Sequence, residues 1–406
     1  MLLITCPFGF SSILGKELKI LGYNSQDTFP TGTFVQGDIF DHQKNLHDKS
    51  FLDERNIPTI GEKVNTNEVK GLQISKTDRC LSAIYNINLA SRIANKVYLS
   101  LGQKKITTFD QLFDFVNSLP FLQYIKVGQK IDISVATKDS ILNSSKTIQS
   151  ISQKAMIKSI LPAGQDRREE DDREYHFEVF IFIQKDICQV FINTSGDSLH
   201  NRGYRKYTVE APIKENVAAG LVLLSGRKFK ENFYDPFCGS GTICIEAAMI
   251  ARNMPPGINR KFAFQNFPDY DHPLFQSIKE KLLSKVYTDK KYQIFGSDID
   301  IDSIQSAKQN AINAGVEDTI TFTQQDFLSI SELSGHILSN PPYGKRLQEF
   351  DLNQTYSHID KLLSNETTTG GIISSYDGFQ NIINPKTYST KTIFNGSDKC
   401  IFWKKI

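Results

Sequence analysis

The stretch that decides the fold of this 406-residue chain is DPFCGSGTICIEAAMIAR, residues 235–252. It follows a short apolar run and has helical spacing downstream of Thr242, so Gly239 and Gly241 lie at a predicted strand-to-helix turn. Glycines at such a turn let the backbone approach a ligand closely, and the helix amino terminus supplies free N–H donors. The stretch therefore predicts a nucleotide-type binding site.

Two common nucleotide motifs do not fit this turn. A dinucleotide-binding site has a third glycine in the pattern G-x-G-x-x-G and an acid about 20 residues further on, and neither is present. The lysine of a phosphate-binding loop is absent as well. The next acid at a predicted strand end is Asp298, which lies beyond a long insertion. A dehydrogenase and a phosphate-loop enzyme are therefore disfavoured.

The second half of the chain alternates strands and helices. Short apolar strands are expected at FYDPF, YQIFGSD, ITFTQQD, GHILSNPP and GGIISSY, and helices at 241–252, 301–314 and 350–364. This alternation implies right-handed crossovers and a parallel sheet that is covered on both faces. The final stretch, YSTKTIFNGSDKCIFWKK, has two extended runs around Asn395-Gly396, which predicts an antiparallel hairpin at the end of the sheet.

The first half of the chain has a different pattern. Residues 1–38 predict strand, helix and strand, and the apolar spacing from Asp78 to Val97 predicts a further helix. The alternating runs HFEVFIFIQKD and ICQVFINTS meet at Lys185-Asp186, which predicts a tight hairpin. These patterns indicate small α+β units before the parallel sheet.

Three predicted strand ends carry an acid, namely Asp235, Asp298 and Asp326. Because the carboxyl ends of parallel strands meet at one edge of a sheet, we expect these carboxylates at one ligand site. One carboxylate there can accept hydrogen bonds from ribose hydroxyls, and another from an adenine amino group. A single acid of this kind is more often a helix cap or a loop residue, and the recurrence at three strand ends favours binding.

The second chemical motif is Asn340-Pro341-Pro342-Tyr343, directly after the fourth strand of this half. Asn340 offers a side-chain carbonyl, and Pro341 offers a backbone carbonyl that its ring holds in one direction. Together they can accept both hydrogens of a planar NH2 group, which aligns a poor nucleophile against an electrophilic methyl. Tyr343 offers a flat face on which a base stacks. The alternative is a proline-rich turn with an Asn cap, and the position beside an acid-lined edge favours the site.

These motifs, together with GSDID and SNPPYGKRL, resemble those of S-adenosylmethionine-dependent amino-methyltransferases. The likeness is to the THUMP-domain guanine-N2 methyltransferases that act on large-subunit ribosomal RNA. The segments SLHNRGYR (198–205) and APIKEN (211–216) resemble that family's joint between RNA-binding and catalytic parts. The resemblance is strong over 198–406 and looser over 1–38 and 78–197.

The resemblance implies an α/β protein with a Rossmann-like methyltransferase domain at 198–406, whose parallel sheet ends in an antiparallel hairpin. Ahead of it, the resemblance implies an N-terminal ferredoxin-like unit at 1–101 and a THUMP RNA-binding unit at 102–197, both α+β. The polar stretch 39–76 has no counterpart in the family's pattern, and we interpret it as an insertion or a long loop. One methyltransferase domain, and so one modification, is expected.

The resemblance also assigns the site residues. The cofactor, S-adenosyl-L-methionine, is expected to contact residues at three strand ends: Asp235, Phe237, Gly239, Gly241, Thr242, Asp298, Ile299, Asp326 and Phe327. Within this set, Asp235 and the two glycines would line the methionine side, and Asp298 the ribose. Asp326 and Phe327 would hold the adenine. The catalytic set that holds the target base would be Asn340, Pro341, Pro342 and Tyr343.

Composition and charge limit the kinds of partner, metal site and cellular location that we expect for this chain. The chain has 47 basic and 45 acidic residues, a net charge of +2, so no global field attracts polyanions and RNA recognition must rely on local patches. Its six cysteines form no C-x-x-C pair, so we expect neither a zinc site nor a disulfide scaffold. No stretch approaches the ~20 apolar residues of a membrane helix, and the amino terminus has no basic leader. We expect a cytoplasmic protein without a metal.

The predicted activity is methyl transfer to the exocyclic N2 of a guanine in RNA, with 23S ribosomal RNA favoured and tRNA as a possible substrate. Because Asn-Pro-Pro-Tyr also serves adenine-N6 and glutamine-N5 methylation, those acceptors stay open. A nonenzymatic RNA-binding assembly factor is the alternative from another class. Candidate phosphate contacts are the basic residues near the motifs and on one predicted helix: Arg202, Arg205, Lys206, Arg260, Lys261, Lys345, Arg346, Lys146, Lys154 and Lys158.

Overall fold

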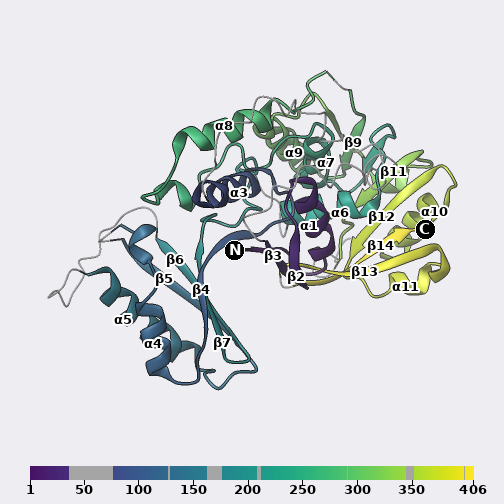
Figure 1. The fold of residues 1–406 in the computed structure, drawn as a ribbon. Helices are drawn as coiled ribbons and strands as arrows, with labels where there is room; N and C mark the ends of the chain where they lie inside the picture. Colours follow the sequence, from purple (N-terminus) through teal and green to yellow (C-terminus); the bar gives the residue numbers. More distant parts are fainter. Residues whose placement is uncertain are drawn as a thin grey trace.

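The computed structural model has two seven-stranded sheets, one from each half of the chain (Figure 1). It describes residues 1–35, 76–126, 129–161, 176–207, 212–289, 291–343, 352–396 and 398–406. The stretch 39–76 lies outside the described residues except for Lys76, as do the charge run at 166–174 and the basic pair Lys345 and Arg346.

The first sheet has the strand order β2-β3-β1-β4-β7-β6-β5 and is antiparallel except for β5 beside β6. Its strands are β1 (Leu2–Thr5), β2 (Ser25–Phe29), β3 (Gly32–Val35), β4 (Lys96–Lys105), β5 (Ile131–Lys138), β6 (Phe177–Gln184) and β7 (Ile187–Asn193). The long β4 pairs with β1 on one side and β7 on the other. It also spans the expected boundary between the unit at 1–101 and the unit at 102–197, so strands of both predicted N-terminal units belong to one sheet.

The helices of this half pack on one face of the sheet. They are α1 (Ser11–Ile20), α3 (Lys76–Ala90), α4 (Phe109–Asn117) and α5 (Ser145–Ile160). Every second residue of β6, from Phe177 to Ile183, is buried, and these side chains share a hydrophobic core with Leu14 of α1 and Met156 of α5. The period of two along the strand is what a sheet with one covered face requires.

Two expectations for the first half are wrong in detail. The sequence did not predict β2, and the helix expected from Asp78 to Val97 ends at Ala90, with Val97 in β4. The buried carboxylate of Glu17 explains the early end, because it accepts hydrogen bonds from Ser91 Oγ at 2.6 Å and from Arg92 N–H at 2.7 Å. A carboxylate on another helix thus takes backbone and side-chain donors just past the last helical turn.

The hairpin at Lys185-Asp186 is confirmed. Both residues have positive φ, +50° and +64°, and they connect β6 directly to β7. Two consecutive left-handed residues are the geometry of a type I′ turn, which matches the twist of the flanking strands.

The second sheet confirms the predicted fold class, because it is parallel through β12 and ends in an antiparallel hairpin. Its strand order is β10-β9-β8-β11-β12-β14-β13. The strands are β8 (Phe233–Asp235), β9 (Ile294–Asp298), β10 (Ile320–Gln324), β11 (Gly335–Ser339), β12 (Thr368–Ser374), β13 (Tyr388–Asn395) and β14 (Asp398–Lys405). The strands lie where the sequence predicted them.

Helices cover both faces of this sheet. They are α6 (Glu215–Ser225), α7 (Thr242–Ala251), α8 (His272–Leu283), α9 (Ile301–Ala314), α10 (Leu352–Ser364) and α11 (Phe379–Ile382). Side chains of α6, α7 and α9 share one core with the N-terminal half, whereas those of α10 and α11 form a second core with Ile337, Ile372 and Trp403. The core of the first sheet therefore continues into one side of the second.

Replacing Gly370 by alanine should destabilise the central strands. Gly370 has φ +103°, and a Cβ there would lie 1.9 Å from the backbone oxygen of Ile337 in β11. Because backbone has to move, we expect the free energy of unfolding to fall by about 2–4 kcal/mol in chemical denaturation. The control is Gly396→Ala, where φ is +67° and nothing lies within 4 Å of the added Cβ, with an expected loss of about 1 kcal/mol. Equal losses would contradict this account.

Candidate functional site

The predicted site residues lie together at the carboxyl edge of the second sheet. Asp235 is the last residue of β8, Asp298 is the last residue of β9, and Asn340 directly follows β11. These strands are parallel neighbours, since β8 pairs with both β9 and β11. The arrangement places a row of polar side chains where open α/β sheets bind their ligands.

The glycine turn has the conformation that its sequence predicts. Gly239 and Gly241 both have positive φ, +49° and +83°, and Gly241 is the N-cap of α7 without any side-chain hydrogen bond to the first turn. The turn is fastened to the next strand, because Gly239 N–H donates to Asp298 Oδ2 at 2.9 Å and Cys238 N–H donates to Ser297 O at 2.9 Å. The N–H groups at the start of α7 remain as anion-binding donors.

Asp298 retains hydrogen-bonding capacity. Its second oxygen, Oδ1, accepts from Asp300 N–H at 3.1 Å, and each carboxylate oxygen has a further lone pair. Burial raises the pKa of this carboxyl above its ordinary value, and backbone N–H donors of Asp300, Gly239 and Ile299 partly offset that rise. Ile299, next in the chain, is 50% exposed and offers an apolar surface beside the carboxylate. The pair can hold a polar sugar next to a flat apolar ring.

Asp326 and Phe327 lie just past β10, at the start of a short 3-10 helix η4 (Phe327–Ser329). Asp326 caps this helix, because its Oδ1 accepts from Leu328 N–H at 2.9 Å. The ring of Phe327 is buried, with its centroid 4.5 Å from that of Phe237. Asp326 is therefore a helix cap, which the sequence analysis gave as the alternative to ligand binding. Its second carboxylate oxygen remains available for a ligand.

Asp235 connects the glycine turn to the Asn-Pro-Pro-Tyr segment. It is 1% exposed and accepts hydrogen bonds from the hydroxyl of Ser339 and from Phe237 N–H at 3.3 Å. Burial raises the pKa of Asp235 to about 7, against the opposing effect of these two donors. Sequence reasoning missed Ser339, although a hydroxyl at the last strand position before Asn340 was the available signal.

The segment from Asn340 to Tyr343 is held from two sides. The hydroxyl of Tyr356 on α10 donates to Pro342 O at 3.3 Å, and the Tyr343 hydroxyl lies 3.7 Å from Cys400 Sγ on β14. Burial raises the pKa of Tyr343 well above its usual range, so its hydroxyl stays protonated. Tyr356 and Cys400 carried no motif in the sequence, and only the fold brings them to this segment.

The Oδ1 atom of Asn340 is buried and has no hydrogen-bond partner among the described residues. Buried carbonyl oxygens in native proteins are almost always paired, so an orphaned one calls for a specific explanation. The side chain directly follows β11 at the polar strand edge. An acceptor in this position is available for an N–H donor of a ligand.

A cavity of about 330 Å³ adjoins this edge of the sheet. That volume is at the lower end of the range of small-molecule sites. Its lining comes from β8, β9, β10 and the connection to β11: Tyr234, Asp235, Pro236, Phe295, Gly296, Ser297, Thr323, Gln325, Ser329, Ile330, Ser331, Glu332 and Leu333. Of the predicted site residues only Asp235 lines it, so the cavity lies beside the predicted set.

Three of the candidate phosphate contacts are structural. Arg202 is 3% exposed and lies 3.5 Å from Glu246, and Arg205 pairs with Glu215 at 3.2 Å. Arg260 donates to backbone oxygens of Asp197, Ser198 and Asn201. Burial could not be read from the sequence, which is why these arginines were taken for surface residues.

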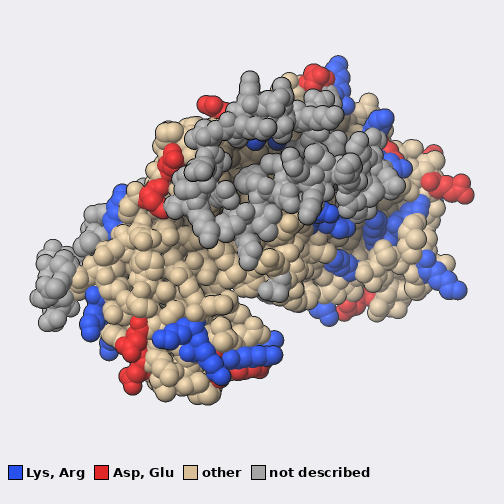
Figure 2. Space-filling model, in the orientation of Figure 1, with Lys and Arg blue, Asp and Glu red and all other residues tan. Residues whose placement is uncertain are grey.

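Other basic side chains do lie on the surface. Lys206, Lys261, Lys146 and Lys154 are exposed, and Figure 2 shows Lys and Arg side chains gathered over the region of β13 and β14. Lys399 on β14 is exposed next to Cys400, which contacts Tyr343. Cationic groups therefore flank the Asn-Pro-Pro-Tyr segment.

Within the described ranges, no group of three or more His, Cys, Asp or Glu side chains is arranged to hold a metal ion. None of the helices in these ranges has the length and apolarity needed to cross a membrane.

Known proteins resemble this chain in both sequence and structure. The family model of the RMKL-like methyltransferase domain matches residues 202–403. "Putative RNA methyltransferase YpsC" of Bacillus subtilis is 34% identical over 335 residues, which cover 80% of this chain and 86% of that protein. The ribosomal RNA large subunit methyltransferase K/L of Shewanella baltica is 31% identical over 79% of this chain and 47% of its own length.

A solved structure has the same fold throughout. The crystal structure of SMU.472, "a putative methyltransferase complexed with SAH", superposes with a TM-score of 0.79 and 29% sequence identity. The match covers 100% of this chain and 97% of that one, so both sheets and their arrangement recur there.

Replacing Asp235 by asparagine should change how stability depends on pH. In the unfolded chain an Asp ionises near 3.8, whereas folded Asp235 keeps its proton to about pH 7. Between these values the folded state binds the extra proton, so this group's contribution to stability is lost as pH rises. The unfolding free energy of Asp235→Asn relative to wild type should therefore increase from about pH 4 to about pH 7, by about 1.4 kcal/mol per unit.

Asp300→Asn is the control with the opposite sign. The hydroxyl of Ser303 lowers the pKa of Asp300, so its contribution is present at neutral pH and is lost in acid. Chemical denaturation across the pH range measures both variants. A difference between Asp235→Asn and wild type that does not vary with pH would contradict the burial of this carboxyl in its neutral form.

Proposed function

Because the chain belongs to the RNA methyltransferase family that carries the RMKL-like domain, we propose that it methylates the exocyclic N2 of a guanine in RNA. We propose S-adenosyl-L-methionine as the methyl donor and 23S ribosomal RNA as the substrate. The observation that carries the proposal is the buried Oδ1 of Asn340, which has no hydrogen-bond partner among the residues that the structure describes and lies beside an acid-lined strand edge. An amino group of a base supplies the N–H donor that this atom lacks.

The residues at the strand edge fit S-adenosyl-L-methionine by their chemistry. When bound, this cofactor supplies an electrophilic methyl group on a sulfonium centre. The free N–H donors at the start of α7 suit its carboxylate, and Asp298 has lone pairs left for the ribose hydroxyls. Ile299 offers an apolar surface for adenine, and Asp326 an oxygen for its amino group. Phe237, Gly239, Gly241, Thr242 and Phe327 complete the proposed pocket.

The catalytic contribution of the chain lies in positioning the amine. Asn340 Oδ1 and the carbonyl oxygen of Pro341 would accept its two hydrogens, and the ring of Tyr343 would stack on the base. Both acceptors bind more strongly as the amine becomes cationic, so they stabilise the transition state more than the ground state. Pro342, fixed by Tyr356, and Asp235, bonded to Ser339, keep this segment in place before substrate arrives.

The relatives support an RNA substrate. The enzyme of Shewanella baltica is named for methylation of large-subunit ribosomal RNA, and this chain spans about half of its length. We propose that the first sheet contains the RNA-binding part, divided into a ferredoxin-like unit at 1–101 and a THUMP unit at 102–197, ahead of the catalytic domain at 198–406. A ribosomal substrate accords with the cytoplasmic location expected from the sequence.

Removing the side chain of Asn340 should abolish most turnover. The Asn340→Ala enzyme should lose about 100-fold or more in kcat, because one of two acceptors for the amine is gone, with cofactor affinity near that of wild type. Calorimetry with S-adenosyl-L-methionine and single-turnover methylation of 23S ribosomal RNA measure the two effects. Asn384→Ala is the control, since Asn384 caps a 3-10 helix away from the strand edge. Equal loss of turnover and cofactor binding would overturn this role for Asn340.

Tyr343 should act through its ring and not through its hydroxyl. The hydroxyl contacts Cys400, so Tyr343→Phe should keep near wild-type kinetics. Tyr343→Ala removes the stacking surface and should lower kcat/KM for RNA by about 5- to 150-fold, with cofactor binding retained. Steady-state kinetics of the two variants test this, and a Phe variant as impaired as the Ala variant would show that the hydroxyl is required.

Nucleoside analysis of ribosomal and transfer RNA from a strain lacking the gene tests the substrate. N2-methylguanine should disappear from one position of 23S RNA and return with a plasmid copy of the wild type. Loss of N6-methyladenine instead would identify the alternative base, and loss from tRNA the alternative RNA. Unchanged nucleosides in both pools, with no binding of S-adenosyl-L-methionine, would favour a nonenzymatic assembly factor.

A further inference from the structure

A continuous row of aromatic side chains crosses the face of the first sheet that the helices leave uncovered. We call it the aromatic row, and its members are Phe29, Phe34, Tyr98, Phe180, Phe182 and Phe191. In β6 the row alternates with Val179 and Ile181, whose side chains share a core with the helices. Successive side chains of a strand point to opposite faces, so the row lies on the other side of the sheet.

The rings contact one another from one strand to the next. Ring centroids lie 6.3 Å apart between Phe182 and Phe180, 6.1 Å between Phe180 and Phe191, and 6.3 Å between Phe191 and Phe34. The interplanar angles of these three pairs are 15°, 23° and 28°, so the rings are nearly parallel. Phe29 continues the row beyond Phe34 at 5.9 Å. The aromatic surface thus extends across strands of both predicted N-terminal units.

This surface is separate from the two hydrophobic cores. Phe191 is fully buried and Leu3, on the same face, is 3% exposed, yet neither belongs to either core cluster of the described residues. The other members of the row are partly exposed. Contiguous apolar surface of this kind on a soluble protein marks an interaction site more often than chance.

Cationic side chains lie at one end of the row. Strand register pairs Lys138 with Gln184 and Lys105 with Ile187, which places both lysines on the face of Phe182, and Lys185 lies in the adjoining turn. In the described parts of the chain, none of the ion pairs involves these three lysines. The acid of the same turn, Asp186, accepts a hydrogen bond from a backbone N–H.

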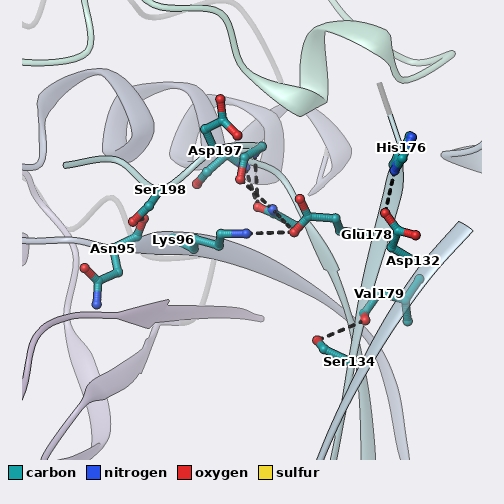
Figure 3. A network of polar contacts seen from close by, with 12 residues as sticks. Asn95, Lys96, Asp132, Ser134, His176, Glu178, Val179, Asp197 and Ser198 are labelled. Atoms are coloured by element: carbon teal, nitrogen blue, oxygen red, sulfur yellow. Dashed lines mark hydrogen bonds and ion pairs between the residues drawn. The ribbon is translucent and has the colours of Figure 1, made fainter. Parts of the chain in front are cut away.

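Polar pairs close the other end of the row. Figure 3 shows the side chain of Lys96 directed at Glu178, with a distance of 2.7 Å between Nζ and Oε2, and His176 directed at Asp132 at 2.6 Å. Asn193 Nδ2 also donates to Glu178 Oε2 at 2.7 Å. Lys96 and Glu178 carry opposite charges, whereas Lys105, Lys138 and Lys185 form no ion pair among the described residues, so the unpaired cations of this face lie at their end.

We propose that the partly exposed rings of the aromatic row form a platform on which unpaired bases of the RNA substrate stack, with phosphates held by Lys105, Lys138 and Lys185. The inference rests on the proposed function for its partner. Aromatic side chains with flanking cations are the features by which proteins bind single-stranded nucleic acid, because every base has a π face. A base-paired helix hides its faces, so the platform selects RNA with unpaired nucleotides.

The experiment measures binding of a short unstructured oligoribonucleotide and of a duplex of the same length by fluorescence anisotropy, with the full chain. Phe182→Ala should weaken binding of the unpaired RNA by about 5- to 150-fold and leave duplex binding unchanged. Phe182→Tyr keeps a stacking ring and should bind as wild type does. Phe109→Ala is the matched control, because Phe109 is 37% exposed at the start of α4 and lies outside the row.

Each other outcome overturns the platform. Unchanged binding by Phe182→Ala would show that the ring takes no part in RNA binding, and equal losses for unpaired and duplex RNA would show that it does not select unpaired bases. Unchanged RNA binding with altered self-association by size-exclusion chromatography would identify a protein partner. Loss by Phe182→Tyr equal to that of Phe182→Ala, with the thermal unfolding midpoint of both variants unchanged, would show that the ring does not act by stacking. The proposed function fails separately, if wild type binds the unpaired RNA but methylates neither 23S RNA nor tRNA.

Discussion

Glu246 lies in α7, four residues after Thr242, and its carboxylate is shielded from solvent with an exposure of 1%. Its Oε1 accepts a hydrogen bond from the Tyr204 hydroxyl at 3.0 Å and lies 3.5 Å from Arg202 Nε. Arg202 in turn donates to the backbone oxygens of Leu199 and Arg92. Because an unpaired buried charge costs several kcal/mol, the glycine-turn helix and the segment before it can only fold together. The site at the start of α7 depends on this contact.

The same contact fixes the first sheet to the second. Arg92 follows α3 of the first half, and its guanidinium donates to Asn253 Oδ1 at 3.1 Å, just beyond α7. Burial lowers the pKa of Arg92, and the carboxylates of Glu17 and Glu246 oppose that shift. Glu17 therefore ends one helix and balances the buried Arg92, which in turn joins the N-terminal half to the second half. This joint fixes the first sheet, where RNA binding is proposed, to the half of the chain that carries the Asn340 edge.

The sequence predicted those structural features whose physical cause lies within a short stretch of the chain. Short stretches of sequence specify the alternation of strands and helices, the glycine turn and the Asn395-Gly396 hairpin. The fold of the second sheet could be predicted from these three features. The end of α3 was not predictable, because Glu17 that causes it lies on another helix. The motif named the site residues, but Ser339 and the two-sided support of Tyr343 came only from packing. Arg202 was misread for the same reason, since burial is a property of the whole fold.

Two buried polar groups have surroundings that lower the stability of the folded chain. Both lie at the strand edge where the ligands are proposed to bind. Burial raises the pKa of Asp235 to about 7, and Asn340 Oδ1 is buried without a hydrogen-bond partner in the described part of the chain. Both lower the stability of the isolated chain, and stability is commonly lower at residues that await a ligand. The joint around Glu246 and the two continuous cores offset that cost, because they hold the strand edge in place without a ligand. Binding at the edge then needs little reorganisation, so its free energy would be available for the proposed alignment of an amine.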